Sequence, residues 1–229
     1  MKYAVVIPAA GQGKRMQAGF NKQFLMLEKK PVIIHTVSVF AHDPWCERIV
    51  VVANENEIED MKQLIQDWKI PNDIDVVPGG SERQDSVMEG LRHISAAEIV
   101  LIHDGARPFI RPLHIHKLVE KAQHQGAAVL GVKIKDTMKR VKDHLVLETI
   151  DRSYVWSVQT PQAFQFPVIY DAYKKAQEEG FRGTDDTSLV ERTGFPVHII
   201  EGDYNNIKLT TPEDITIAQA ILKKQTEED

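Results

Sequence analysis

The chain has 229 residues, of which 42% are hydrophobic and 27% are charged, a composition typical of a folded globular protein. Its formal net charge of -5 argues against a duplex nucleic-acid binder, because such proteins usually carry a basic domain. No stretch approaches the roughly 18 apolar residues of a transmembrane helix, and the apolar run near the N-terminus is too short for a secretory signal. We therefore expect a cytoplasmic protein whose partners include neither nucleic acid nor a membrane.

The single cysteine, Cys46, cannot form an internal disulfide. It follows an apparent turn and precedes a predicted strand, and no neighbouring pattern indicates a lowered thiol pKa. We interpret it as a structural residue.

Short apolar runs alternate with amphipathic helical patterns in the first part of the chain. The predicted strands are 3–8, 48–53, 73–77, 98–103 and 127–132, and the predicted helices are 31–40, 57–68, 81–94 and 111–125. Ser81 with Gln84 fits a capping box at the start of the third helix. Gly126 fits the end of the fourth. Strands separated by helices of ten to fifteen residues indicate βαβ units, an α/β fold and a mostly parallel sheet of the Rossmann-like kind.

The pattern changes after Lys133. The segments 134–141 and 145–150 flank a turn at 142–144 and predict a β-hairpin. Their many charged residues leave two interpretations open, a solvated hairpin or an arm that packs on a second subunit. Helices at 167–179 and 184–193, a strand at 197–201 and a final helix after Thr211 complete a single domain, 1–229, into which an arm of about 134–152 is inserted.

A glycine-rich loop follows the first predicted strand, with the sequence Pro8-Ala9-Ala10-Gly11-Gln12-Gly13-Lys14-Arg15-Met16. Small residues at this position let backbone N–H groups approach phosphate oxygens. The loop does not satisfy the P-loop pattern, because Pro8 and Arg15 stand where Gly and Ser or Thr are needed. It fails the dinucleotide fingerprint at Met16. The cations after the loop predict a phosphate site, and the alternative is a set of solvated charges on an ordinary turn.

Two further strand ends carry similar residues. Pro78-Gly79-Gly80-Ser81 leads into a helix, and Asp104-Gly105-Ala106-Arg107 follows the strand at 98–103. A simple salt bridge between Asp104 and Arg107 is one alternative, and His103 is interpreted as a core residue. Because ligands bind at the carboxyl ends of parallel strands, these loops predict one shared site.

At this point the chain resembles the 2-C-methyl-D-erythritol 4-phosphate cytidylyltransferases of the non-mevalonate isoprenoid pathway. The resemblance covers nearly the whole chain in the family's order, through the segments PAAGQGKRM, NKQF, PGGSERQDSV, HDGARP, DTMKR, TIDRS, QTPQAF, TDDTS and NIKLTTPED. It implies a nucleotidyltransferase that moves CMP from CTP to 2-C-methyl-D-erythritol 4-phosphate and releases pyrophosphate. A ribitol 5-phosphate cytidylyltransferase is the alternative, and DTMKR and NIKLT favour the methylerythritol enzyme.

The resemblance also implies roles for individual residues. The catalytic set comprises Arg15, Lys22, Arg152 and Lys208. The set that binds CTP comprises Pro8, Ala9, Ala10, Gly11, Gly13, Gly80, Arg83, Ser86, Asp104 and Gly105. The set that binds the acceptor comprises Arg107, Thr137, Arg152, Thr184 and Lys208, with a weaker expectation for Asp185.

Thr137 and Arg152 are expected to reach the neighbouring subunit's site from the arm, which implies a homodimer. Mg²⁺ is expected to bind mainly through the triphosphate, and no residue is assigned as its ligand. Two departures from the family's pattern stand at Ser81, where an acid is common, and at Gly105, where Ala is common.

Overall fold

The structure is a computed structural model that describes the chain except for residues 12–21, 72–73, 95–96 and 229. The side chains of Lys22 and of residues 226–228 also lie outside the description. Its centre is a seven-stranded sheet in the order β11-β7-β10-β6-β1-β4-β5. The strands are β1 (Tyr3–Pro8), β4 (Cys46–Ala53), β5 (Ile74–Pro78), β6 (Ile99–Ile102), β7 (Ala127–Lys133), β10 (Trp156–Gln165) and β11 (His198–Glu201).

The sheet is mostly parallel, as the sequence predicts. β1 pairs in parallel with β4 and β6, β4 with β5, and β7 with β11. The exception is β10, which runs antiparallel between β6 and β7. This strand was not predicted. Its register shifts between Val158 and Gln162, around Pro161, and a proline in a strand is normally a sign of an edge or an irregularity.

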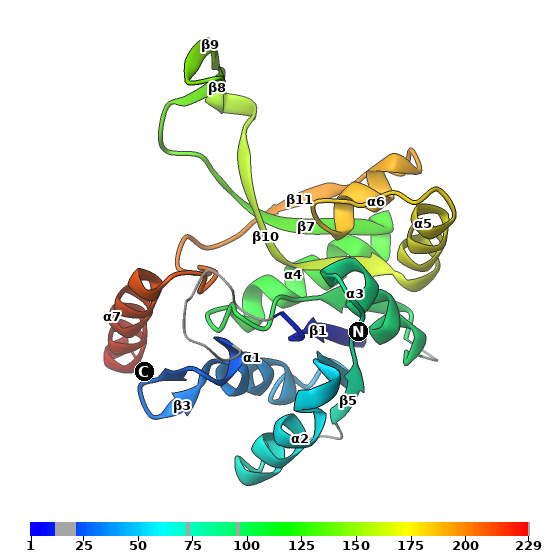
Figure 1. Cartoon of the computed structure of the whole chain (residues 1–229), viewed down its shortest axis with the longest axis vertical. Helices are drawn as coiled ribbons and strands as arrows, with labels where there is room; N and C mark the ends of the chain where they lie inside the picture. The colour runs from blue at the N-terminus through cyan, green and yellow to red at the C-terminus, as the bar shows by residue number, and fades with distance from the viewer. Residues whose placement is uncertain (12–21, 72–73, 95–96, 229) are drawn as a thin grey trace.

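Helices cover both faces of the sheet (Figure 1). They are α1 (Val32–Ala41), α2 (Ile58–Asp67), α3 (Arg83–Arg92), α4 (Pro112–Gln125), α5 (Phe166–Glu178), α6 (Asp186–Arg192) and α7 (Pro212–Glu228). Short 3-10 turns occur at η2 (Lys22–Phe24), η3 (Glu55–Glu57) and η4 (Arg152–Tyr154), and β2 (Met26–Leu27) pairs with β3 (Lys30–Pro31).

The two faces of β1 bury alternate residues. Val5 and Ile7 belong to a core with side chains of α1, α2 and α4, whereas Ala4 and Val6 belong to a second core with α3, α5 and α6. This follows from the two-residue period of a strand. It also explains why β1 is hydrophobic throughout, as a strand covered on both faces must be.

The start of α3 differs from the prediction. The helix begins at Arg83 after Glu82, and the Glu82 N–H donates to the Asp85 carboxylate over 3.2 Å. The predicted partner Gln84 instead donates to the Phe181 carbonyl. An acid in the first turn is favoured near the positive end of the helix dipole, and Asp85 fills that place.

The hairpin of β8 (Met138–Lys142) and β9 (Leu145–Ile150) extends away from the body of the molecule (Figure 1). Its turn residues Asp143 and His144 both have positive φ, 48° and 64°, which is the geometry that two-residue hairpin turns require. The hairpin exposes several large apolar side chains, namely Val141, Leu145, Val146 and Leu147.

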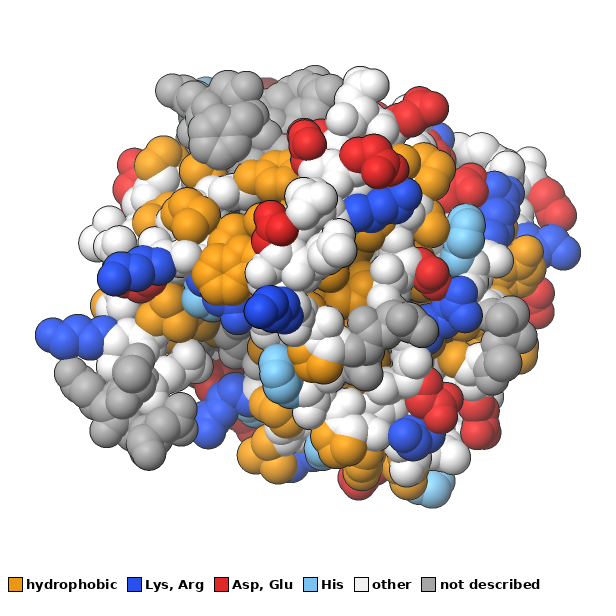
Figure 2. Space-filling view, turned by 90° about the horizontal axis from the view of Figure 1, so that it is seen from below, with side chains coloured by type: hydrophobic (Ala, Val, Ile, Leu, Met, Phe, Trp, Pro, Cys, Tyr) orange, Lys and Arg blue, Asp and Glu red, His pale blue; other side chains and the backbone are white. Residues whose placement is uncertain are grey.

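Elsewhere the surface mixes charges of both signs. On the face seen in Figure 2, basic and acidic side chains lie among apolar ones. Among the described residues, no helix is long and apolar enough to cross a bilayer. Cys46 is buried, and burial raises the pKa of its thiol to about 12, in agreement with a structural role.

Candidate active site

A cavity of about 680 Å³ opens at the carboxyl ends of β1, β4, β5 and β6. The loops that follow these strands supply its walls, which is where parallel sheets place their ligands. Its lining residues are Pro8, Ala10, Gly11, Gln23, Asn54, Gly80, Ser81, Glu82, Arg83, Ser86, Asp104, Gly105, Ala106 and Lys208.

Eight of the residues predicted to bind CTP thus lie around one cavity. Ala9 does not line it: its side chain is fully buried, and its N–H donates to the Val52 carbonyl over 2.7 Å. Gly13 lies outside the described residues. The loops that surround the cavity are far apart in sequence, so their meeting depends on the order of strands in the sheet rather than on any local motif.

The Gly79-Gly80 loop is packed against the start of α3. A Cβ on Gly79 would lie 2.7 Å from the Ser86 hydroxyl oxygen and 2.9 Å from the Ala10 Cβ, so only glycine fits. The buried Ser86 hydroxyl accepts from the Gly80 N–H over 3.2 Å and donates to the Glu82 carbonyl over 3.1 Å. These contacts fix the backbone of one cavity wall.

Asp104 is the electrostatic centre of the cavity. Its Oδ2 lies 2.7 Å from Lys208 Nζ, and its Oδ1 accepts from Arg83 Nε over 3.2 Å. Arg107 Nε lies 3.8 Å from Oδ2. Burial by itself raises the pKa of this carboxyl, but the cations of Arg83 and Lys208 hold the pKa well below its usual range. Asp104 is therefore an anion at neutral pH.

The backbone of Asp104 is fixed from the neighbouring strand. Its N–H donates to the Thr160 hydroxyl of β10 over 3.0 Å. His103 donates from Nε2 to the Arg107 carbonyl over 3.0 Å, which leaves Nδ1 to accept from Thr160 over 3.2 Å. Burial lowers the pKa of His103 to about 4. The residue is fully buried, as predicted, and both ring nitrogens serve the loop rather than the cavity.

A second segment reaches the site from near the C-terminus. Arg107 Nη1 donates to the Asn206 carbonyl over 2.7 Å, and the Leu209 N–H donates to the Ala106 carbonyl over 2.9 Å. Asn206 in turn donates from its side chain to the Thr160 carbonyl over 2.9 Å. These bonds hold the 206–209 segment against the loop after β6, and they explain how Lys208 comes to lie beside Asp104.

The remaining predicted residues either lie outside the described part of the chain or are not among those that line the cavity. Arg15 is outside the described residues, as is the side chain of Lys22. Arg152 is exposed at the base of the arm, where its guanidinium donates to the Lys135 carbonyl, and Thr137 is exposed just before β8. Thr184 is exposed in the loop before α6. Within this one subunit, the arm residues are not among those that line the cavity.

Sequence reasoning missed several residues of the site. Gln23 and Asn54 line the cavity, and Thr160 and Asn206 hold its walls. The segments NKQF, QTPQAF and NIKLTTPED contain Gln23, Thr160 and Asn206, so the resemblance carried a signal for three of them. Asn54 lies in none of the quoted segments, and its polar type occurs in any loop.

The carboxylates near the cavity would offer a metal ion few direct ligands. Among the described residues, no group of three or more His, Cys, Asp or Glu side chains is arranged to hold a cation. Asp104 presents a single carboxylate to the cavity, already paired with cations. Mg²⁺ keeps several waters and binds through one or two carboxylates plus substrate phosphates, so these residues fit a triphosphate-bound ion.

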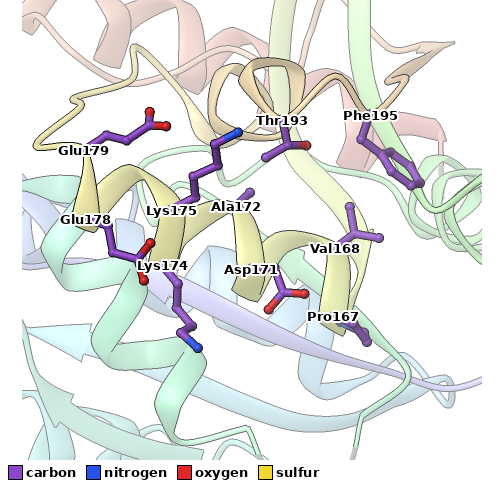
Figure 3. Close-up of a pocket in the computed structure, with 10 residues that line it drawn as sticks. All are labelled: Pro167, Val168, Asp171, Ala172, Lys174, Lys175, Glu178, Glu179, Thr193 and Phe195. Carbon is purple, nitrogen blue, oxygen red and sulfur yellow. The ribbon is translucent and has the colours of Figure 1, made fainter.

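A separate hollow lies along α5 and is shown in Figure 3. Acidic and basic side chains of α5, including Asp171, Lys175 and Glu178, lie around it, with Phe195 at one end. They do not converge on a common point as the cations around Asp104 do. We therefore place the candidate active site in the cavity beside Asp104.

The chain is also similar to known proteins. A sequence profile described as 2-C-methyl-D-erythritol 4-phosphate cytidylyltransferase matches residues 3–224. A curated relative with that name from Bacillus velezensis is 55% identical over 227 residues, which cover 99% of this chain and 98% of the relative. Another, from Geobacillus kaustophilus, is 52% identical over 228 residues, covering both chains in full.

Solved structures of the same kind superpose on this one. The 4-diphosphocytidyl-2C-methyl-D-erythritol synthase of Anaerococcus prevotii has a TM-score of 0.86 at 32% identity, over 97% of this chain and 96% of its own. The cytidylyltransferase of Thermus thermophilus has a TM-score of 0.81 at 28% identity, over 97% and 100%. The chain belongs to the 2-C-methyl-D-erythritol 4-phosphate cytidylyltransferase family, a family of nucleotidyltransferases.

Proposed function

We propose that the chain transfers CMP from CTP to 2-C-methyl-D-erythritol 4-phosphate and releases pyrophosphate. The observation that carries the proposal is the cavity beside Asp104, in which glycine-rich loops, a buried serine and a cluster of cations meet at the carboxyl edge of the sheet. The sequence relatives are named 2-C-methyl-D-erythritol 4-phosphate cytidylyltransferases, and ribitol 5-phosphate is not favoured as the acceptor.

The chemistry needs no strong general base. The second pKa of a phosphomonoester is near 6, so the acceptor phosphate is already largely a dianion at neutral pH. One of its oxygens attacks the α-phosphorus of CTP in line with the departing pyrophosphate. His103 is buried with a low pKa and both nitrogens in use, so it is not placed to act as a base. Catalysis then depends on positioning and on charge.

Cations supply that charge. In this proposal Arg15 and Lys22 contact the triphosphate and stabilise the charge that develops at phosphorus, while Lys208 and Arg107 hold the acceptor phosphate. Lys208 is only about a third exposed and Arg107 less, so their charges act in a partly desolvated site. Mg²⁺ would neutralise triphosphate oxygens there. Gly80, Ser86 and the loop after β1 would hold the cytidine.

A homodimer through the arm completes the proposed site. Thr137 and Arg152 stand on an arm that leaves its own subunit's body, and the arm exposes apolar residues that a second subunit would cover. In a twofold dimer each arm serves the other subunit. A cytoplasmic location stays a prediction of the same kind.

Subunit mixing tests the arm. Arg152→Ala and Lys208→Ala homodimers should each be nearly inactive. If the arm crosses between subunits, a random mixture regains about a quarter of the sites, because each mixed dimer has one site with both residues intact. A mixture no more active than its components, with mixed dimers verified by mass spectrometry, would show that Arg152 does not act across subunits.

The transfer reaction is tested by coupled pyrophosphate release with CTP and Mg²⁺. The acceptors are 2-C-methyl-D-erythritol 4-phosphate and ribitol 5-phosphate at equal concentration. We expect turnover with the first. Turnover with ribitol 5-phosphate alone would replace the proposed acceptor, and release independent of either acceptor would remove transferase activity.

A further inference from the structure

Behind the cavity, at the first residue of α6, the side chain of Asp186 is fully buried. Its carboxylate accepts two parallel hydrogen bonds from Arg83, 2.9 Å from Nη1 to Oδ1 and 2.7 Å from Nη2 to Oδ2. The buried Tyr173 hydroxyl of α5 donates a third, over 2.5 Å. A carboxylate buried without such partners would be very unfavourable, so this arrangement is closely determined.

Asp186 divides the hydrogen bonds of the Arg83 guanidinium. The two terminal nitrogens face Asp186, and only Nε reaches Asp104, at Oδ1. Arginine prefers to bind one carboxylate with two parallel bonds, and Asp186 takes that role here. Oδ2 of Asp104 is consequently left to Lys208 Nζ at 2.7 Å.

The backbone around Asp186 is fixed by other residues. Gln162 of β10 donates from Nε2 to Asp185 Oδ2 over 2.7 Å and accepts at Oε1 from the Thr187 N–H over 2.9 Å. Gln84 accepts from the Gly183 N–H over 3.0 Å. We therefore expect removal of the Asp186 charge to release the Arg83 guanidinium, while these other hydrogen bonds keep α6 in place.

We propose that Asp186, oriented by Tyr173, is a positioning residue of the nucleotide cavity, which holds Arg83 in the wall and keeps it from forming a two-bond pair with Asp104. This inference rests on the proposed function. Without the Asp186 charge, Arg83 turns towards Asp104, competes with Lys208 for that carboxylate and changes the shape of the cavity.

The test combines four variants of the full chain: Asp186→Asn, Tyr173→Phe, Arg83→Met and the double variant that joins Asp186→Asn with Arg83→Met. Calorimetry gives the dissociation constant of CTP with Mg²⁺, and pyrophosphate release gives kcat and KM. Arg192→Ala is the matched control. Arg192 lies on the same helix as Asp186, and its replacement breaks only an exposed ion pair with Glu179. Thermal unfolding sets a temperature at which every variant is folded.

We expect Asp186→Asn to weaken CTP binding about fivefold or more and to lower kcat/KM about tenfold, with Tyr173→Phe shifting both in the same direction by about two- to fivefold. In the Arg83→Met background the addition of Asp186→Asn should alter CTP binding by less than about twofold, because no guanidinium remains to be held. Arg192→Ala should match the wild type.

Two results would overturn the proposal. One is an Asp186→Asn variant that melts at a lower temperature but, when folded, binds CTP and turns over like the wild type. The other is a double variant in which the two single effects multiply. If the wild type binds CTP but turns over neither acceptor, the proposed function fails, and the CTP dissociation constants still decide the role of Asp186.

Discussion

Replacing Lys208 with methionine separates the catalytic role of the cavity from its contribution to stability. Methionine keeps most of the length and the apolar stem of lysine but removes the ammonium group. In the structure that group lies 2.7 Å from Asp104 Oδ2, with about a third of the Lys208 side chain exposed. The question is whether its loss is felt mainly in folding or in turnover.

The structure predicts a small effect on folding. Solvent screens the partly exposed ammonium of Lys208, although Asp104 itself is buried, and we assign the pair about 1 kcal/mol, as for exposed pairs. Asp104 keeps Arg83 at 3.2 Å and Arg107 at 3.8 Å, so its charge is not left alone. For a chain of this size, about 1 kcal/mol corresponds to a fall of roughly 2–4 °C in melting temperature.

The effect on turnover should be much larger. A group that stabilises charge in a partly closed site typically contributes about 10²–10³ in rate, or about 2.7–4 kcal/mol of transition-state stabilisation. We therefore expect Lys208→Met to lose about a hundredfold or more in kcat/KM with less than about 4 °C of melting temperature.

Pyrophosphate release and differential scanning fluorimetry measure the two quantities on one preparation. Lys62→Met is the control, since Lys62 forms an exposed pair with Glu59 and lies on α2. A kcat/KM within about tenfold of the wild type would remove Lys208 from the mechanism. A fall in melting temperature much above about 4 °C would show that the pair with Asp104 is worth more to the fold than its exposure allows.

Three further predictions concern buried residues of the fold. Gly90→Ala should lower the free energy of unfolding by about 1–3 kcal/mol in chemical denaturation, because the new Cβ would lie 2.4 Å from Val6 Cγ1. This loss outweighs the better helix propensity of alanine. Unchanged stability would show that α3 can move away from the sheet. His103 is neutral in the folded state because its pKa is about 4, so its contribution to stability is complete above the unfolded pKa near 6.5 and declines as pH falls towards 4. At pH 5 this loss is about 2 kcal/mol relative to pH 7.5, and His103→Gln should show a correspondingly shallower pH dependence of unfolding; equal slopes would contradict the assignment. Cys46 in the native protein should react with a thiol-specific disulfide reagent far more slowly than after unfolding, and rapid native labelling would contradict its burial.

The sequence predicted the strands and helices whose pattern follows from burial. Strand β1 occupies the predicted residues 3–8, and β4, β5, α4 and α5 differ from their predicted bounds by at most two residues at either end. These elements are covered on at least one face by a core, so their apolar periodicity is strong. The start of α3 was misplaced because Ser81, Glu82 and Asp85 can each serve a helix N-terminus, and local sequence does not rank them.

Strand β10 shows what local pattern cannot supply. Its hydrophobic and polar residues do not alternate regularly, and they include Pro161. Its strand conformation depends on β6 and β7, which pair with it on either side. In the same strand, Thr160 accepts a hydrogen bond from the Asp104 N–H, and Gln162 donates one to Asp185 at the start of α6. The formation of this strand depends on tertiary pairing, and its polar residues connect distant parts of the site. The strand and the roles of its polar residues were therefore missed for the same reason, namely that neither is visible in the local sequence.

The sequence predicted that the strand-end loops share one site, and the structure adds how the charged residues of that site pair with one another. Asp104 and Asp186 stand 82 positions apart in the numbering, yet both bind the guanidinium of Arg83. From sequence, a simple salt bridge between Asp104 and Arg107 was the alternative interpretation, but their closest N–O distance is 3.8 Å and the shorter contacts go to Arg83 and Lys208. Among the described residues, the cations of the cavity, Arg83 and Lys208, are paired with carboxylates. The electrostatic field that a triphosphate meets therefore depends on the buried Asp186 as well as on the residues that line the wall.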